Sequence, residues 1–144
     1  MQTVLDTLIQ GHQTFQESLE EASSASFRLS LDTRNDCAAE HCRIAREFVF
    51  DHAIPHMNEE DEVLYPEAQR LGVPSEVIKL LSGDHDLLRH LAAELEREGL
   101  TVGATTMSDR LASLLERFVH VFDWHVAREE MLVRESADVL EKAS

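Results

Sequence analysis

Metal-binding side chains occupy positions that should carry the apolar core of a helical protein. Apolar residues recur at helical spacing along the chain, and six residues interrupt that pattern: His12, His56, Glu60, His85, His125 and Glu129. An ionised glutamate inside a core loses much of its hydration free energy unless it is protonated, paired with a cation or bound to a metal. Two glutamates and four histidines facing one interior therefore favour a bound metal over a metal-free bundle with protonated glutamates.

Two of the histidines are followed by a glutamate four residues later, as His56–Glu60 and His125–Glu129. Residues at i and i+4 lie about 40° apart around a helix and about 6 Å apart along it, so a pair can reach one metal ion or two adjacent ions. Imidazoles and carboxylates without a thiolate suit iron, manganese or zinc. Six donors are too many for one tetrahedral zinc, which predicts a dinuclear centre bridged by the glutamates.

The six residues are also expected at one level of the molecule. His12 and His85 each lie about ten residues from the start of a predicted helix, which is roughly 15 Å along it. Each glutamate lies about 11 residues before the end of its predicted helix, and the histidine of its pair about 15, which is roughly 16–23 Å from the same end of an antiparallel bundle. The ligands of four antiparallel helices can therefore share one layer.

Four stretches of helical periodicity must position these residues. They run from Thr3 to the serine-rich region 23–26 or slightly beyond, from about Asp36 to Leu71, from about Ser75 to Gly99, and from about Thr106 onwards. Such helices with short connections pack most simply as an up-down-up-down four-helix bundle, so we expect an all-α fold and a single domain over residues 1–144. The apolar stripe expected for the second helix includes His52 and Val63.

The expected helix ends carry suitable capping residues. Gly72 is expected to close the second helix in the left-handed conformation, and Pro74 prevents its continuation. Ser75 is expected to be the N-cap of the third helix. Thr106 and Asp109 resemble a capping box at the start of the fourth, with Asp in place of Glu.

Composition excludes several classes of protein. The chain has 144 residues with 13 basic and 28 acidic side chains, a net charge of −15, which would repel both nucleic acid and an anionic membrane surface. Only five glycines and three prolines are present, which disfavours a turn-rich sandwich or barrel. No secretion signal or long uncharged apolar run is visible, so we expect a cytoplasmic protein. Cys37 and Cys42 point apart on one helix and are expected to be unlinked, buried or half-buried thiols.

The motifs around the six residues resemble a known family. PHMNEEDEVLYP (55–66) and HVAREEMLV (125–133) are similar to the two His-x-x-x-Glu segments of hemerythrin-like proteins, which carry an HHE-type cation-binding domain. GDHDLLRHL around His85 and IQGHQTF around His12 are similar to the family's single-histidine positions. The resemblance covers essentially the whole chain. It implies a non-haem di-iron centre with an oxo or hydroxo bridge, held by His12, His56, Glu60, His85, His125 and Glu129, with the two glutamates as bridging carboxylates; manganese and zinc are disfavoured.

One residue departs from the oxygen-carrying members of this family. They have a second histidine four residues after the ligand of the third helix, where this chain has Arg89. His90 is one residue further on and points about 140° away from His85, so we do not expect it to replace that ligand. The centre is then expected to have an open or water-filled position, which suits reaction with O2, peroxide or nitric oxide better than simple reversible carriage.

Several neighbours of the expected ligands have structural interpretations. His52 is either a further ligand or a donor that orients a neighbouring carboxylate or bonds within the core, and the second role is favoured. Pro55 is expected to kink the helix before His56. Tyr65 and Trp124 are expected to be packing residues away from the ligands. A solvated acidic face is expected for Glu59, Asp61 and Glu130. Gly11 and Gly83, beside two ligands, could either leave room for a small molecule or relieve helix crowding.

The leading functional hypothesis is a di-iron protein that binds or reacts with O2, peroxide or nitric oxide. The alternative is a module that senses or sequesters iron or oxygen without turnover, and whether the protein is an enzyme stays open because one ligand set serves carriers, sensors and oxidoreductases. The expected partner is a small molecule and not nucleic acid or a membrane. The sequence indicates neither an oligomeric state nor a redox partner.

Overall fold

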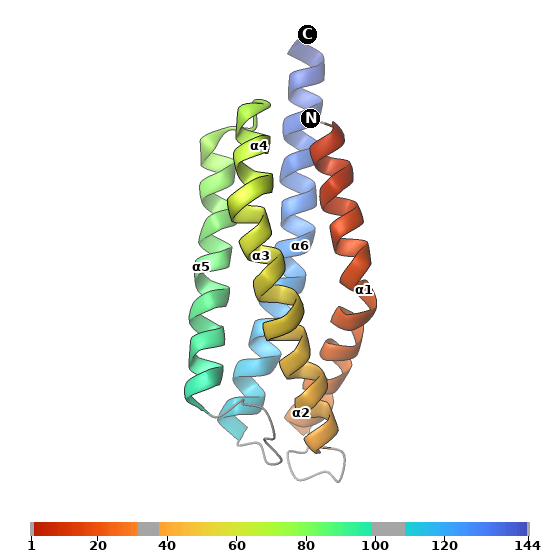
Figure 1. The fold of residues 1–144 in the computed structure, drawn as a ribbon, viewed down its shortest axis with the longest axis vertical. Coiled ribbons are helices and arrows are strands. Elements are labelled where there is room, and N and C mark those ends of the chain that lie inside the picture. The colour runs from red at the N-terminus through yellow and green to blue at the C-terminus, as the bar shows by residue number, and fades with distance from the viewer. Residues whose placement is uncertain (1, 32–37, 99–108, 144) are drawn as a thin grey trace.

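The computed structural model describes residues 2–31, 38–98 and 109–143 and shows four helical rods lying side by side (Figure 1). Three rods are single helices: α1 (Gln2–Leu31), α5 (Ser75–Arg97) and α6 (Asp109–Ala143). Successive rods run in opposite directions, and α6 projects past the N-terminal end of α1 (Figure 1). The prediction of an all-α, up-down-up-down four-helix bundle is confirmed.

The second rod changes its helical form four times along its length. It consists of α2 (Ala38–Glu47), the π-helical segment η1 (Phe48–Ala53), α3 (Ile54–Glu59), a second π-helical segment η2 (Glu60–Leu64), and α4 (Tyr65–Arg70). The backbone N–H groups of Ile54 and Tyr65, just after the two π segments, donate to the carbonyls five residues earlier, on Val49 and Glu60. The second rod therefore contains two wide turns, each ending just before a proline.

The prolines explain where the wide turns lie. Pro55 and Pro66 are each the second residue of the α-helical segment that follows a π segment. A proline has no N–H for the carbonyl four residues earlier, and its ring pushes that carbonyl away, so the preceding turn opens. The kink predicted at Pro55 thus takes the form of a π-helical segment.

The turn between α4 and α5 ends the second rod as the sequence predicts. Gly72 has φ 112°, and its N–H donates to Gln69 while the N–H of Val73 donates to Ala68, the two bonds of a Schellman motif. The prediction of Ser75 as N-cap is wrong by one position. Pro74 precedes the helix with extended backbone, and its carbonyl accepts the first helical hydrogen bonds. Thr106 of the expected capping box lies outside the described residues.

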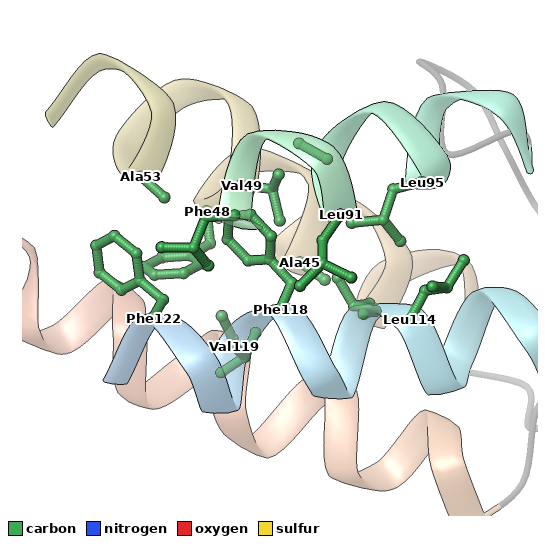
Figure 2. Packing of buried hydrophobic residues seen from close by; sticks show 14 of the residues in the cluster. Ala45, Phe48, Val49, Ala53, Leu91, Leu95, Leu114, Phe118, Val119 and Phe122 are labelled. Atoms are coloured by element: carbon green, nitrogen blue, oxygen red, sulfur yellow. The ribbon is translucent and has the colours of Figure 1, made fainter. Parts of the chain in front are cut away.

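The apolar core falls into two clusters at different levels of the bundle. The larger one includes Phe48, Phe118 and Phe122, whose rings pack edge to face or in parallel, with Leu91 and Leu95 of α5 beside them (Figure 2). The smaller one consists of Leu5, Leu8, Ala68, Val73 and Val133, with the partly buried Val77 and Ile78 of α5 packed against it. Each rod carries polar residues between its contributions to the two clusters, so a polar layer separates them.

Most of the expected stripes are buried, but two residues of the second rod are not. His52 is exposed and Val63 is 61% exposed, contrary to prediction. His52 lies within η1 and Val63 within η2. A π-helical turn contains more residues than an α-helical turn, so side chains in and after it point in directions that regular α-helical spacing does not predict. In the described parts of the chain, no helix combines the length and apolar composition needed to cross a membrane.

Candidate metal centre

The polar layer brings together all six residues that the sequence singles out. Their metal-binding atoms form two overlapping groups, and within each group these atoms lie within 4.8 Å of one another. One group contains His12 and His56, the other contains His85 and His125, and both include Glu60 and Glu129. His56 is half-buried and the other five are at most 3% exposed.

The two glutamates connect the groups, Glu129 through its two oxygens and Glu60 through a single oxygen. Glu129 Oε1 lies 2.8 Å from His12 Nε2, whereas Glu129 Oε2 lies 3.3 Å from His125 Nε2. Glu60 Oε1 lies 3.3 Å from His56 Nε2 and 3.2 Å from His85 Nε2. Each carboxylate therefore faces both groups, which is the arrangement that bridges two adjacent cations.

Three carboxylates outside the layer orient the histidine rings. The Nδ1 atom lies 2.7 Å from Glu130 in His12, 2.9 Å from Asp61 in His85 and 2.8 Å from Asp84 in His125. An N–H donated at Nδ1 fixes the ring and leaves Nε2 as the lone-pair donor towards the centre. Carboxylate partners of this kind are typical of metal-binding histidines.

Sequence analysis missed these three partners. Asp61 and Glu130 are wrongly predicted to belong to a solvated acidic face, whereas the prediction for Glu59 is confirmed by its exposure. Asp61 and Glu130 each come directly after a glutamate of the centre, so they point past it to a histidine on the adjacent rod. His52, expected to fill such a role, is exposed instead.

Arg89 has a definite place beside the centre. Its guanidinium donates to Asp61 Oδ2 and, over 3.1 Å, to Asn58 Oδ1, so it supports the carboxylate that holds His85. The neighbouring His90 is exposed and lies 3.2 Å from Glu94, away from the centre as predicted. The residue four positions after His85 is thus an arginine that bonds Asp61, the partner of His85.

The prediction of Tyr65 as a packing residue away from the candidate ligands is also wrong. Its hydroxyl donates to Glu129 Oε2 and lies 3.3 Å from His85 Nε2, and its ring stacks on that of His85. On a regular α-helix Tyr65 would point about 140° away from Glu60. The π-helical segment η2 closes a five-residue turn between them and brings both side chains to the interior. The proline that follows Tyr65 was the available signal.

Other expectations hold in part. Cys42 is buried, as predicted, and burial raises the pKa of its thiol; Cys37 lies outside the described residues. Trp124 faces away from the ligands but is 51% exposed, with the guanidinium of Arg128 4.8 Å from its ring.

Burial and close charges shift the pKa values of the cluster in opposite directions. Burial and the charge of Glu129 raise the pKa of Glu60 well above its usual range. Burial lowers the pKa of His56 to about 4. Burial opposes the charged form of His125, but hydrogen bonds to Glu129, Glu60 and Asp84 outweigh it and raise the pKa to about 10. Without a cation, the cluster must hold protons to offset two buried carboxylates.

Two polar atoms of the cluster fit a cation better than a proton network. Glu60 Oε2 and His56 Nε2 are buried and have no hydrogen-bond partner among the described residues. A buried acceptor without a partner costs about 1–3 kcal/mol. Both residues belong to the group with His12, and nitrogen and carboxylate oxygen donors are those that iron, manganese and zinc accept. The residues therefore fit a metal.

Comparison with known families agrees with this geometry. The hemerythrin HHE cation-binding domain matches residues 3–135, so the chain belongs to the family of hemerythrin HHE cation-binding domains. Searches of curated proteins and of solved structures give no significant match. The chain is thus a cation-binding-domain protein with a His/Glu cluster that can hold a metal.

Proposed function

We propose that this protein is a non-haem di-iron protein that binds or reacts with O2, peroxide or nitric oxide inside the bundle. The observation that carries the proposal is the sharing of Glu60 and Glu129 between two four-residue groups, because one cation would use only one group. Four histidines, two carboxylates and no thiolate favour iron over softer metals. Iron would supply one-electron redox chemistry that no side chain of the cluster provides.

The protein's own part is to present donors and exclude water. His12 and His56 would hold one ion, His85 and His125 the other, and the two glutamates both. The Tyr65 hydroxyl, next to His85 Nε2, is close enough to serve as a seventh donor on the second ion. In this proposal Tyr65 partly replaces the histidine whose position Arg89 occupies.

Aromatic rings limit access to the position of the ion that His12 and His56 would hold. The Phe15 ring centroid lies 4.7 Å from that of His56, and the Phe122 centroid lies 6.4 Å from it. Both contacts are edge to face, and both phenylalanines belong to the larger apolar cluster. On the side of the larger apolar cluster these walls keep bulk water away from His56 and strengthen electrostatic interactions at the centre.

An optical experiment tests the proposed iron chemistry. Protein grown with iron, exposed to air and then reduced is expected to show ferric bands with an oxo bridge that disappear on reduction. His56→Ala and Glu129→Ala should lose these bands while remaining folded, whereas His90→Ala, a change of an exposed histidine, should keep them. Identical spectra for the wild type and the His56 variant would contradict the proposal.

Turnover decides between an enzyme and the alternative, a non-catalytic module for sensing or sequestering iron or oxygen. Steady-state consumption of hydrogen peroxide or nitric oxide, lost in the two ligand variants, would make the protein an oxidoreductase. An intact iron spectrum without turnover would favour the module. A cytoplasmic location is part of the proposal, and so is the absence of nucleic-acid or membrane partners, which the net charge of −15 supports.

A further inference from the structure

A cavity of about 140 Å³ lies beside the first group of ligands, between α1 and the second rod. Leu8 and Gly11 line it from α1, and Val63 and Leu64 from η2, while its polar lining includes His56 and Glu60. Val63 is 61% exposed, so the cavity opens towards the surface. It therefore connects solvent with the atoms that are expected to hold one ion.

Gly11 leaves much of this space open. A Cβ atom added at Gly11 would lie 3.7 Å from His56 Cε1, an ordinary contact, and a longer side chain would extend into the cavity. Gly83, the glycine beside His85, has nothing within 4 Å of an added Cβ. Two roles were considered for these glycines: leaving room for a small molecule, or relieving a close contact between helices. The first role therefore suits Gly11, and the second suits neither glycine.

The size of the cavity exceeds what a diatomic molecule needs. A protein cavity of about 150 Å³ accommodates benzene, and O2 or nitric oxide is far smaller. The walls formed by Leu8, Val63 and Leu64 are apolar, so they favour an apolar body and disfavour a charged one. Glu59 also lines the cavity, and with Glu60 it would repel an anion.

The inner end of the cavity carries unpaired acceptors. Glu60 is 1% exposed, and its Oε2 atom and His56 Nε2 have no hydrogen-bond partner in the described part of the chain. In the metal-free protein a hydroxyl group there would donate to such an acceptor. In the metal-loaded protein, where these two atoms would bind the ion, the oxygen of the hydroxyl group would face that ion. The polar end of an occupant is therefore placed towards His56 and its apolar body towards Val63.

We propose that this cavity binds a small neutral organic molecule of about benzene size that ends in one hydroxyl or hydroperoxide group. The proposal rests on the proposed function in that it names the substrate class of the same centre. The cavity itself is formed by the protein alone, so binding can be tested without metal.

The test uses phenol as the probe and compares matched glycine variants. Phenol is titrated into metal-free wild type, Gly11→Leu and Gly83→Leu, following the NMR signals of His56 and the Val63 methyl groups. Both substitutions replace a helical glycine, so they have similar effects on helix propensity. We expect saturable binding to the wild type and Gly83→Leu, and at least tenfold weaker binding to Gly11→Leu. Equal binding by the two leucine variants, or none by the wild type, would overturn the proposal.

Three further arms sharpen the result. Gly11→Ala should fold normally and weaken phenol binding less than leucine does; unchanged affinity in both Gly11 variants places the probe elsewhere. Toluene, which lacks the hydroxyl, and benzoate, which is charged, should bind more weakly than phenol, and equal affinities would contradict the assigned chemistry. Iron uptake by Gly11→Leu is measured separately. In the wild type, phenol binding without iron uptake would reject the proposed function alone, and iron uptake without phenol binding would reject this inference alone.

Discussion

The Tyr65 hydroxyl donates a hydrogen bond to Glu129 across the bundle, although the two residues are 64 positions apart in the chain. The bond fixes a carboxylate that both groups of candidate ligands share, and Tyr65 also stacks on His85. One tyrosine thus restrains two of the proposed ligands, and it reaches them only because η2 is a wide turn.

Tyr65→Phe should leave the bundle folded but weaken the centre. Glu129 Oε2 loses its donor while staying buried, so the metal-free protein should lose about 1–2 kcal/mol of unfolding free energy. Iron affinity should fall by about 10- to 100-fold, as is typical when the partner of a metal ligand is removed. Chemical denaturation and iron competition titrations measure the two effects. Phe15→Leu, which alters packing near His56 without removing a hydrogen bond, is the control, and equal iron affinities for Tyr65→Phe and wild type would refute the role.

The outer carboxylates should matter for metal binding more than for folding. Asp61→Asn and Asp84→Asn replace the carboxylates that hold His85 and His125 with neutral amides, which accept more weakly and can also present an N–H, so each should weaken metal binding by about 10- to 100-fold. Glu62→Gln is the matched control, because Glu62 is exposed. Calorimetric titration with a divalent metal compares the variants. If Glu62→Gln weakens binding as much as Asp61→Asn, the effect is one of net charge and the assigned role is wrong.

Glu60→Gln should separate stability from metal binding. Burial and the charge of Glu129 raise the pKa of Glu60, so its carboxyl group is costly in the metal-free protein. In the presence of a chelator, the free energy of unfolding of the variant should be about 1 kcal/mol higher than that of the wild type. It should also lose most of the rise in melting temperature that added metal gives the wild type. A variant that is less stable without metal would show that the carboxylate stabilises the fold on its own.

The metal-free protein should be most stable near neutral pH. The folded-state pKa of His125 is raised to about 10, so its contribution is complete below about pH 6.5, the value for an unfolded histidine, and is lost as the pH rises towards 10. The folded-state pKa of His56 is lowered to about 4, so stability falls as the pH drops from about 6.5 to 4 and the unfolded chain takes up a proton. Urea unfolding at a series of pH values measures both limbs.

Two variants show which histidine causes each decline in stability with pH. His125→Gln should flatten the decline between about pH 6.5 and 10, and His56→Gln should reduce the decline between about pH 6.5 and 4. A wild-type stability that keeps rising up to pH 10 would contradict the raised pKa of His125.

Sequence patterns predicted the fold and the six clustered residues because both depend on regular helical spacing. The expected stripe of α1, from Leu5 to Ala22, is buried as predicted. In the second rod the same rule failed at His52, Val63 and Tyr65, because two π-helical segments shift the buried face. Regular spacing assumes a constant number of residues per turn, and the prolines break that assumption.

The outer partners could not be read from periodicity for a different reason. Asp61 and Glu130 each bond a histidine on the adjacent rod, so their role depends on how the rods are rotated and on side-chain rotamers. Helical spacing describes one rod at a time and says nothing of such contacts. A search for an acidic residue directly after each His-x-x-x-Glu pair would have found both.

Metal stoichiometry tests the central claim most directly. Metal-free protein is equilibrated with ferrous iron in the absence of oxygen, freed of unbound metal and analysed for iron per chain. Two shared carboxylates and two groups of ligands predict a plateau of two ions per chain. A plateau at one ion or fewer would contradict the dinuclear centre.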